Sequence, residues 1–328
     1  MTQNQSGVSE QLKIKILNGQ LPGVCQVQRP ESKIKKMPVS HTAGKTVKGG
    51  YEPGPPKTAQ EIMMELNSLV GLQSVKKLIE EIYAFVEIQK KRQKEKLAVE
   101  NLVLHMIFKG NPGTGKTTVA RILGRLFKEV GVLPRGHLVE VERADLVGEF
   151  IGHTAQKTRE QIKQALGGIL FIDEAYSLAR GGEKDFGKEA IDAMVKGMED
   201  HRDNLILILA GYQEEMDRFL ETNPGLRSRF PIHITFPDYS IKELLAIADI
   251  MLKQRQYVLS SGAREELRFI IEKEHKRHEH SGNARLVRNL IEQAIRRQAV
   301  RLLYKKGELS RNDLMTITRE DLESAAGN

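Results

Sequence analysis

The chain has 328 residues, more than a single core usually fills, so we expect one large domain and a smaller companion. Hydrophobic residues make up 40% and charged residues 29%, which excludes wholesale disorder, and the lone cysteine, Cys25, excludes an intramolecular disulfide or a cysteine-rich zinc site. The net charge of +8 is compatible with a nucleic-acid partner, and nothing indicates an oxidising compartment, so we expect a cytoplasmic protein.

The first 58 residues are predicted to form a flexible basic arm rich in glycine and proline. Residues 1–57 hold nine basic and three acidic side chains, a net charge of +6 that leaves only +2 for the rest of the chain. Because a surface that binds a phosphate backbone needs clustered lysine and arginine, this near-balanced body makes a nucleic-acid partner unlikely. Composition does not distinguish a solvated tail from a segment that docks on a partner, and both interpretations of the arm stay open.

Helical periodicity begins at Ala59. Apolar residues from Val75 to Val86 recur at helical spacing up to a charged run at residues 90–96, which we interpret as a solvated helix end. The segment is predicted to lead into an α/β domain.

Five apolar segments separated by helical spacing are predicted to be strands. They are residues 102–108, 138–141, 169–172, 205–209 and 232–236. Strands that alternate with helices predict a doubly wound parallel five-stranded sheet of the α/β class. The apolar runs fall far short of the ~20 residues of a membrane helix, and the N-terminus lacks the core of a signal peptide.

Strand patterns end at Asp238. Residues 240–254, 264–275 and 284–304 carry helical apolar spacing, and no further strand is expected. We therefore predict a large α/β domain over residues 59–238 and a small helical domain over residues 239–328.

A glycine-rich loop follows the first predicted strand and opens a helix. It reads G-N-P-G-T-G-K-T and matches G-x-x-x-x-G-K-[ST] in the strand–loop–helix context that this phosphate-binding motif requires. Its backbone N–H groups suit the phosphates of ATP, Lys116 suits the β- and γ-phosphates, and the Thr117 hydroxyl suits a bound Mg²⁺. The predicted nucleotide contacts are Gly110, Asn111, Pro112, Gly113, Thr114, Gly115, Lys116, Thr117 and Thr118.

Two carboxylates emerge from the third predicted strand. Asp173 and Glu174 follow the apolar run I-L-F-I, which on its own is equally typical of a strand that meets a loop. Together with the phosphate loop, the pair indicates that Asp173 holds Mg²⁺ and that Glu174 polarises the water that attacks the γ-phosphate.

These motifs resemble the AAA+ superfamily across residues 60–320. The resemblance implies that Val70 and Gly71 pack around adenine and that Arg285 is the sensor 2 arginine, which reaches the γ-phosphate from the small domain. It also implies that Arg229, preferred over Arg227, is an arginine finger that enters a neighbouring subunit's site. A solvated surface arginine is the simpler alternative for Arg229.

One position departs from the superfamily pattern. The fourth strand is commonly followed by a polar sensor 1 residue, often asparagine or threonine, but this chain reads L-A-G-Y-Q at residues 209–213. Tyr212 and Gln213 are both candidates, and the sequence does not choose between them.

Further segments narrow the resemblance to the CbbX/SpoVK family, which includes red-type Rubisco activases. The segments are residues 148–154, 173–178 and 223–229, and residues 104–106, 181–187 and 312–317 bring the chain nearer to the sporulation branch. The resemblance implies self-assembly, expected as a hexameric ring, a protein substrate, and a role in late spore maturation in a Gram-positive spore former.

Phe150, Ile151 and Gly152 follow the second strand and resemble the pore loop with which hexameric AAA+ motors grip a polypeptide. Burial of the two apolar side chains in the core is the alternative. The sequence thus favours an ATP-driven remodeller of a protein substrate over a nucleotide-gated assembly factor of the clamp-loader or replication type, or a Rubisco-activase-like protein.

Three histidines lie close together in the small domain. His275, His278 and His280 lack a metal-binding spacing and lie among basic residues, whose charge opposes a cation. We therefore interpret them as a solvated basic helix end rather than a metal site.

Overall fold

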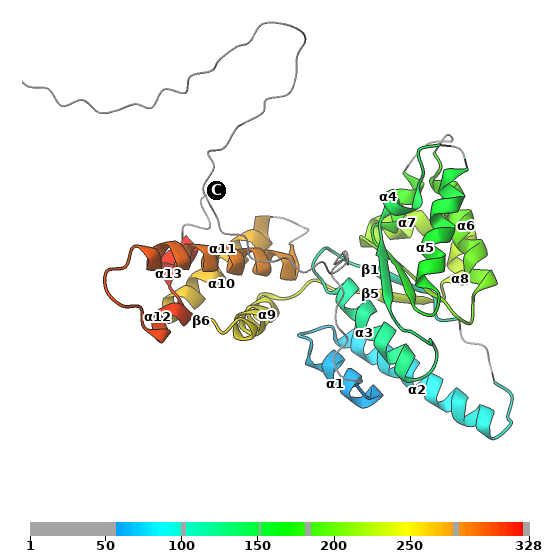
Figure 1. The fold of residues 1–328 in the computed structure, drawn as a ribbon, viewed down its shortest axis with the longest axis horizontal. Helices are drawn as coiled ribbons and strands as arrows, with labels where there is room; N and C mark the ends of the chain where they lie inside the picture. The colour runs from blue at the N-terminus through cyan, green and yellow to red at the C-terminus, as the bar shows by residue number, and fades with distance from the viewer. Residues whose placement is uncertain (1–56, 100–102, 151, 181–184, 278–281, 324–328) are drawn as a thin grey trace, which may run out of the picture. The chain divides into compact units, whose positions relative to one another are not determined.

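The predicted strands form a five-stranded parallel sheet in a computed structural model of the chain, which describes residues 57–99, 103–150, 152–180, 185–277 and 282–323 (Figure 1). The strand order is β2-β3-β4-β1-β5, so β4 lies between β1 and β3. The strands are β1 (Met106–Lys109), β2 (Leu138–Val141), β3 (Ile169–Ile172), β4 (Ile206–Gly211) and β5 (Ile232–Thr235). The predicted fold class is confirmed.

The first strand is shorter than predicted. It begins at Met106 rather than at residue 102, because the register pairs Met106 with Ile208 and Ile232 and the ladder starts there. The last strand ends at Thr235, although the Phe236 N–H still donates to the Lys109 carbonyl at 2.7 Å.

Alternate strand residues face two separate hydrophobic cores. In β3, Ile169 and Phe171 belong to one core, and Leu170 and Ile172 belong to the other. All four side chains are fully buried, as a parallel sheet covered on both faces requires. The core that holds Phe171 also receives the apolar faces of α1, α2 and α3, and the other core receives those of α5, α6 and α7.

Eight α-helices and one 3-10 helix surround the sheet among the described residues. They are α1 (Ala59–Ser68), α2 (Gln73–Lys94), α3 (Lys116–Glu129), α4 (Arg143–Leu146), α5 (His153–Ala165), η1 (Ala175–Ala179), α6 (Gly187–Asp200), α7 (Gln213–Thr222) and α8 (Pro224–Arg229). α1 starts at a capping box, in which the Thr58 hydroxyl and the Glu61 carboxylate each accept from the other's backbone N–H.

A second group of helices follows β5. They are α9 (Ile241–Gln254), α10 (Ser261–Arg277), α11 (Asn283–Leu303), α12 (Arg311–Met315) and α13 (Arg319–Glu323). The prediction that strands end at Asp238 is wrong, because β6 (Val258–Leu259) pairs in parallel with β7 (Thr316–Ile317). Strands of two residues are too short to show an alternating pattern.

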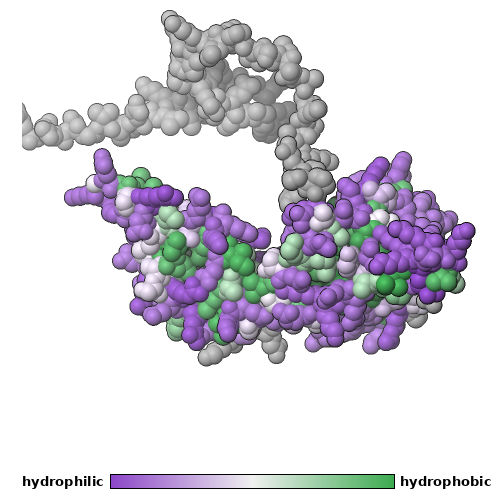
Figure 2. Space-filling model, turned by 90° about the horizontal axis from the view of Figure 1, so that it is seen from below, coloured by the Kyte–Doolittle hydropathy of each residue, from purple (hydrophilic) through white to green (hydrophobic). Residues whose placement is uncertain are grey.

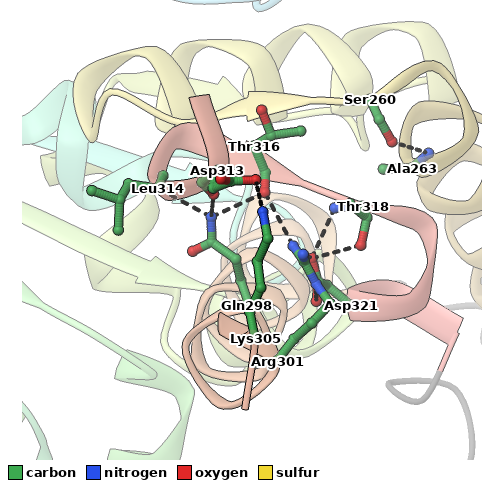
Figure 3. Close-up of polar contacts among 10 residues, drawn as sticks. All are labelled: Ser260, Ala263, Gln298, Arg301, Lys305, Asp313, Leu314, Thr316, Thr318 and Asp321. Carbon is green, nitrogen blue, oxygen red and sulfur yellow. Dashed lines mark hydrogen bonds and ion pairs between the residues drawn. The ribbon is translucent and has the colours of Figure 1, made fainter. Parts of the chain in front are cut away.

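Buried polar side chains of α11 hold the last segments in place (Figure 3). Gln298 is 3% exposed, and its amide Nε2 lies 3.0–3.2 Å from the carbonyl oxygens of Asp313, Leu314 and Thr316. Arg301 binds the buried Asp321 carboxylate through two contacts of 2.9 Å. This network explains how a short, weakly apolar segment keeps a fixed path.

The face drawn in Figure 2 is mostly hydrophilic, with apolar residues in scattered patches. Several large apolar side chains are exposed among the described residues, and two of them are phenylalanines: Phe150 of the α/β part is 64% and Phe269 of the helical part is 60% exposed. Within the described part of the chain, no helix combines the length and apolarity needed to cross a bilayer.

Several predicted features lie outside the described residues. They are the basic arm with Cys25, Ile151, the segment 181–184, His278 and His280. Of the histidine group, His275 lies in α10 and is exposed.

Candidate nucleotide-binding site

The loops that follow β1, β3 and β4 meet at the carboxyl edge of the sheet. Because β4 lies between β1 and β3, the residue after β4 falls between the phosphate loop and the two carboxylates. A cavity of about 730 Å³ opens there, a size typical of small-molecule sites. Its lining includes the predicted residues Val70, Gly110, Pro112, Gly113, Gly115, Lys116, Thr117, Thr118, Asp173, Glu174 and Arg285.

Three predicted nucleotide contacts are absent from that lining. Thr114 is fully buried, and its hydroxyl donates to the Asn111 carbonyl at 2.8 Å. The Asn111 amide turns instead to Asp238, with Nδ2 at 2.8 and 3.0 Å from the two carboxylate oxygens. Gly71 lies against Glu243 and Tyr239, since an added Cβ would come within 3.1 Å of Glu243 Cδ and 3.3 Å of Tyr239 Cε1. These residues shape the loops rather than face the cavity.

The phosphate loop adopts positive φ angles at positions that are occupied by glycine. Gly113 and Gly115 have φ of +75° and +99°, values that other residues adopt only with strain. The turn ends at α3, which starts at Lys116, so the helix N-terminus points its N–H groups at the loop.

Lys116 is turned onto its own loop. Its Nζ donates to the carbonyl oxygens of Gly110 at 2.7 Å and Asn111 at 2.9 Å. Burial lowers the pKa of this ammonium group, the nearby Asp173 carboxylate raises it, and the Arg285 charge lowers it further. The charges of Asp173 and Arg285 therefore both act on the ammonium group of Lys116.

Asp173 and Glu174, the two acidic residues after β3, differ in backbone conformation and in contacts. Asp173 accepts the Glu174 N–H at 3.0 Å, and Glu174 is exposed with a left-handed φ of +48°. Positive φ is costly for glutamate and recurs at functional sites, where the surroundings enforce it. The strained position therefore directly follows Asp173 at the edge of the sheet.

A lysine that the motif search missed fixes the loop beside the cavity. Lys76 of α2 is 9% exposed, and its Nζ donates to the carbonyl oxygens of Asn67 at 3.1 Å and Leu69 at 2.5 Å. Burial lowers the pKa of this lysine, and Glu243 opposes the shift. The contacts anchor the segment that carries Val70.

One of the two candidates for sensor 1 lines the cavity. Tyr212 lines the cavity between the phosphate loop and Glu174, whereas Gln213 begins α7 and is absent from the lining. Tyr212 also packs near Tyr176, with ring centroids 6.0 Å apart.

Other predicted site residues lie away from this cavity. Arg229 ends α8 and pairs with Glu199 of the same chain, with Nη2 and Nε at 2.6 and 2.9 Å from Oε1. Phe150 lies on the loop between α4 and α5, where its ring meets the His153 ring edge-on at 5.4 Å. Gly152 caps α5 with φ of +82° and is exposed.

The donor set fits ATP and Mg²⁺. Lys116 and Arg285 supply positive charge for phosphates, and Thr117 and Asp173 supply the hydroxyl and carboxylate oxygens that Mg²⁺ prefers. Leu69, Leu72, Ile250 and Met251 give the cavity an apolar side suited to a base.

Comparison with known proteins decides the family. Residues 106–238 match the AAA family, described as the ATPase family associated with various cellular activities, and residues 240–328 match the AAA lid domain. The chain is an AAA+ ATPase. As a member of this family it is an ATP hydrolase, and α9 to α13 belong to its lid.

Two curated relatives place this ATPase in the CbbX/SpoVK family. It is 58% identical to stage V sporulation protein K of Bacillus subtilis over 273 residues, which cover 82% of this chain and 84% of the relative. It is 47% identical to the chloroplastic ribulose bisphosphate carboxylase/oxygenase activase of Cyanidioschyzon merolae, over 80% of this chain and 90% of the relative.

A solved structure of katanin supports the fold. It aligns with a TM-score of 0.51 at 18% identity and covers 82% of this ATPase and 86% of the katanin chain. At that identity the likeness concerns the arrangement of the elements alone.

Sequence reasoning missed cavity residues that come from distant segments. They carry no motif of their own and are Glu65 and Ser68 of α1, Ile247, Ile250, Met251 and Gln254 of α9 with the following Arg255, and Arg288 and Glu292 of α11. The place of Arg288 at the cavity could have been predicted from the sequence, because it lies about one helical turn from Arg285 and hence on the same face of α11.

Proposed function

We propose that this ATPase couples Mg-ATP hydrolysis to the remodelling of a protein substrate in a hexameric ring, and that it acts in the cytoplasm in late spore maturation. The observation that carries the proposal is the exposure of Phe150, 64% accessible on a loop outside the nucleotide cavity. Large aromatic side chains that stay in water on a monomer commonly mark binding surfaces.

The proposed chemistry follows from the residues around the cavity. Lys116 exchanges the carbonyls of Gly110 and Asn111 for the phosphates, which satisfy its charge better. Thr117 and Asp173 hold Mg²⁺, which offsets phosphate charge when bound. Glu174 orients the attacking water and accepts its proton.

The proposed ring rests on Arg229, which lies outside the cavity of its own chain. Arg229 does not line that cavity, so it serves there only if a neighbouring copy presents it. Katanin, which has the same fold, self-assembles. The name of the Bacillus subtilis relative supports the process proposed for this ATPase.

A Rubisco-activase-like function is the second candidate. The observation in its favour is the 47% identity with the activase of Cyanidioschyzon merolae. Reactivation of inhibited red-type Rubisco by this ATPase would favour the second candidate over the first.

Replacement of the proposed base tests the function. Glu174→Gln keeps the size and shape of the side chain but accepts no proton, so we expect turnover to fall at least ~10²-fold with little change in ATP affinity. Phosphate release and binding of a fluorescent ATP analogue measure the two quantities. Lys116→Ala is the contrasting variant, because it should weaken binding itself.

The same variant tests whether ATP hydrolysis is required for spore formation in the cell. In a Bacillus subtilis strain that lacks stage V sporulation protein K, we expect this ATPase to restore heat-resistant spores and Glu174→Gln to fail. Near-normal hydrolysis by Glu174→Gln would refute the role of that residue, and absence of rescue by the unchanged protein would refute the sporulation role.

A further inference from the structure

Two buried side chains connect the start of α11 with the phosphate loop. Asn283 is completely buried, and its Oδ1 accepts the Tyr239 N–H at 2.9 Å. Tyr239 is 7% exposed, and its hydroxyl donates to the Thr114 carbonyl at 3.1 Å. Burial raises the pKa of Tyr239 to about 12, so the hydroxyl keeps its proton for this contact.

The amide of Asn283 makes a second connection. Its Nδ2 donates to Asp238 Oδ1 at 2.7 Å, and Asp238 also accepts the Asn111 amide of the phosphate loop. Asp238 is exposed, so water competes for this contact, and the buried Tyr239 route is the firmer of the two.

The backbones of the two segments are also in direct contact. The Ala284 N–H donates to the Gly113 carbonyl at 3.2 Å. A Cβ at Gly113 would lie 2.5 Å from the Gly282 carbonyl and 2.8 Å from the Arg285 nitrogen, so no side chain fits between loop and helix. Asn283 itself has a left-handed φ of +46°, a conformation that asparagine adopts more readily than most residues.

We infer that Asn283 and Tyr239 are positioning residues that clamp the start of α11 to the phosphate loop and thereby present Arg285 to the γ-phosphate. Arg285 follows Asn283 by two residues, and its N–H donates to Gly282 at 2.9 Å, so its backbone moves with the clamp. The charge of Arg285 already acts on Lys116 in this arrangement. The inference rests on the role of Arg285 in the proposed function.

The clamp predicts a specific kinetic pattern. A clamp residue touches no phosphate, so its loss should lower kcat through Arg285 while the adenine and the β-phosphate stay bound. A residue that only stabilises the fold would instead change melting and leave the kcat of the folded protein intact. The effects of losing the clamp and losing Arg285 should also overlap, because both remove the same interaction.

The variants isolate the hydrogen bonds. Asn283→Gly removes the amide but tolerates the positive φ, and Tyr239→Phe removes only the hydroxyl. We expect each to lower kcat about tenfold and to leave the KM for ATP within about threefold when measured at a temperature at which a thermal melt shows the variant to be folded. Arg285→Ala should lower kcat at least as much, and each double variant should fall no further than Arg285→Ala alone.

Two results would overturn the inference. The first is an unchanged kcat in both Asn283→Gly and Tyr239→Phe, and the second is a double variant whose loss equals the product of the single losses. Either result leaves the proposed chemistry standing if Glu174→Gln still abolishes turnover. Normal turnover in Glu174→Gln would instead contradict the proposed function.

Discussion

His105 illustrates how a single buried residue ties the stability of this ATPase to pH. The ring lies just before β1, where it is 5% exposed, and its Nδ1 accepts the Leu207 N–H at 3.0 Å. Its centroid lies 5.8 Å from that of Phe230, which follows Arg229. The acceptor role requires a neutral ring, and protonation would place a charge in an apolar site.

This environment predicts a loss of stability in mild acid. Burial lowers the pKa of His105 from 6.5 to about 4, so the unfolded chain takes up a proton more readily than the folded one. The stabilising contribution is complete above pH 6.5 and is lost as the pH falls toward 4; between pH 7 and pH 5 it should decrease by about 2 kcal/mol. Urea unfolding at both pH values measures the difference.

His105→Gln is the control for that prediction. Glutamine offers a carbonyl oxygen to Leu207 but does not titrate, so the variant should lose less stability than the unchanged protein on going from pH 7 to pH 5. Equal losses in both proteins would show that other groups cause the acid sensitivity.

Motifs revealed single residues only where the chemistry is local in the chain. The places of Lys116, Thr117 and Asp173 at the cavity were predictable, because fixed spacing and an adjacent strand define them. Tyr239 and Asn283 were not, because their function depends on a contact between residues more than 40 positions apart, which one sequence does not reveal.

At the scale of elements, the sequence predicted the buried strands well and the short elements poorly. Residues 138–141 and 169–172 were correct to the residue. In β3 the reason is that a fully buried strand leaves a continuous apolar run, whereas β2 is only partly buried and carries the exposed Glu140. β6 and β7 were missed because two residues carry no period, and backbone pairing alone defines them. The path of the chain around them depends on Gln298, whose three carbonyl partners lie 15 to 18 residues away.

The loop between α4 and α5 allows a test of whether Phe150 contacts a polypeptide substrate or packs in the core. Phe150 is mostly in water, so Phe150→Ala should change the melting temperature little, whereas truncation of a buried phenylalanine typically costs about 3–5 kcal/mol. We expect basal ATPase activity to remain and stimulation by casein, an unfolded polypeptide, to disappear. Phosphate release with and without casein, beside a thermal melt, measures both properties.

Phe269 provides a matched control for this loop. It is 60% exposed on α10 of the lid, so Phe269→Ala removes the same group from a different element. This variant should keep both melting and casein stimulation. Early melting of Phe150→Ala, or equal loss of stimulation in the two variants, would contradict a grip specific to the Phe150 loop.

At the scale of the whole molecule, the proposed ring predicts that one chain alone holds an incomplete set of positive charges for ATP hydrolysis. Lys116, Arg285 and Arg288 line the cavity, but Arg229 lies outside it and pairs with Glu199. That pair is partly exposed on both sides, and exposed ion pairs contribute at most about 1 kcal/mol, so a neighbouring subunit's phosphate would compete for the arginine at little cost.

A mixing experiment tests whether Arg229 acts between subunits. Arg229→Ala keeps an intact phosphate loop, and Lys116→Ala keeps an intact arginine, so each should be nearly inactive alone because every site lacks one group. If the arginine comes from a neighbour, random mixing in equal amounts places a complete set at about one interface in four, and activity should rise toward about a quarter of the unchanged protein. Arg227→Ala, on the same helix, is the control. It should be active alone, and mixing it with Lys116→Ala should lower the activity only in proportion to the fraction of intact phosphate loops. A mixture of Arg229→Ala and Lys116→Ala that stays inactive while forming mixed rings would show that the arginine does not complete a neighbouring site.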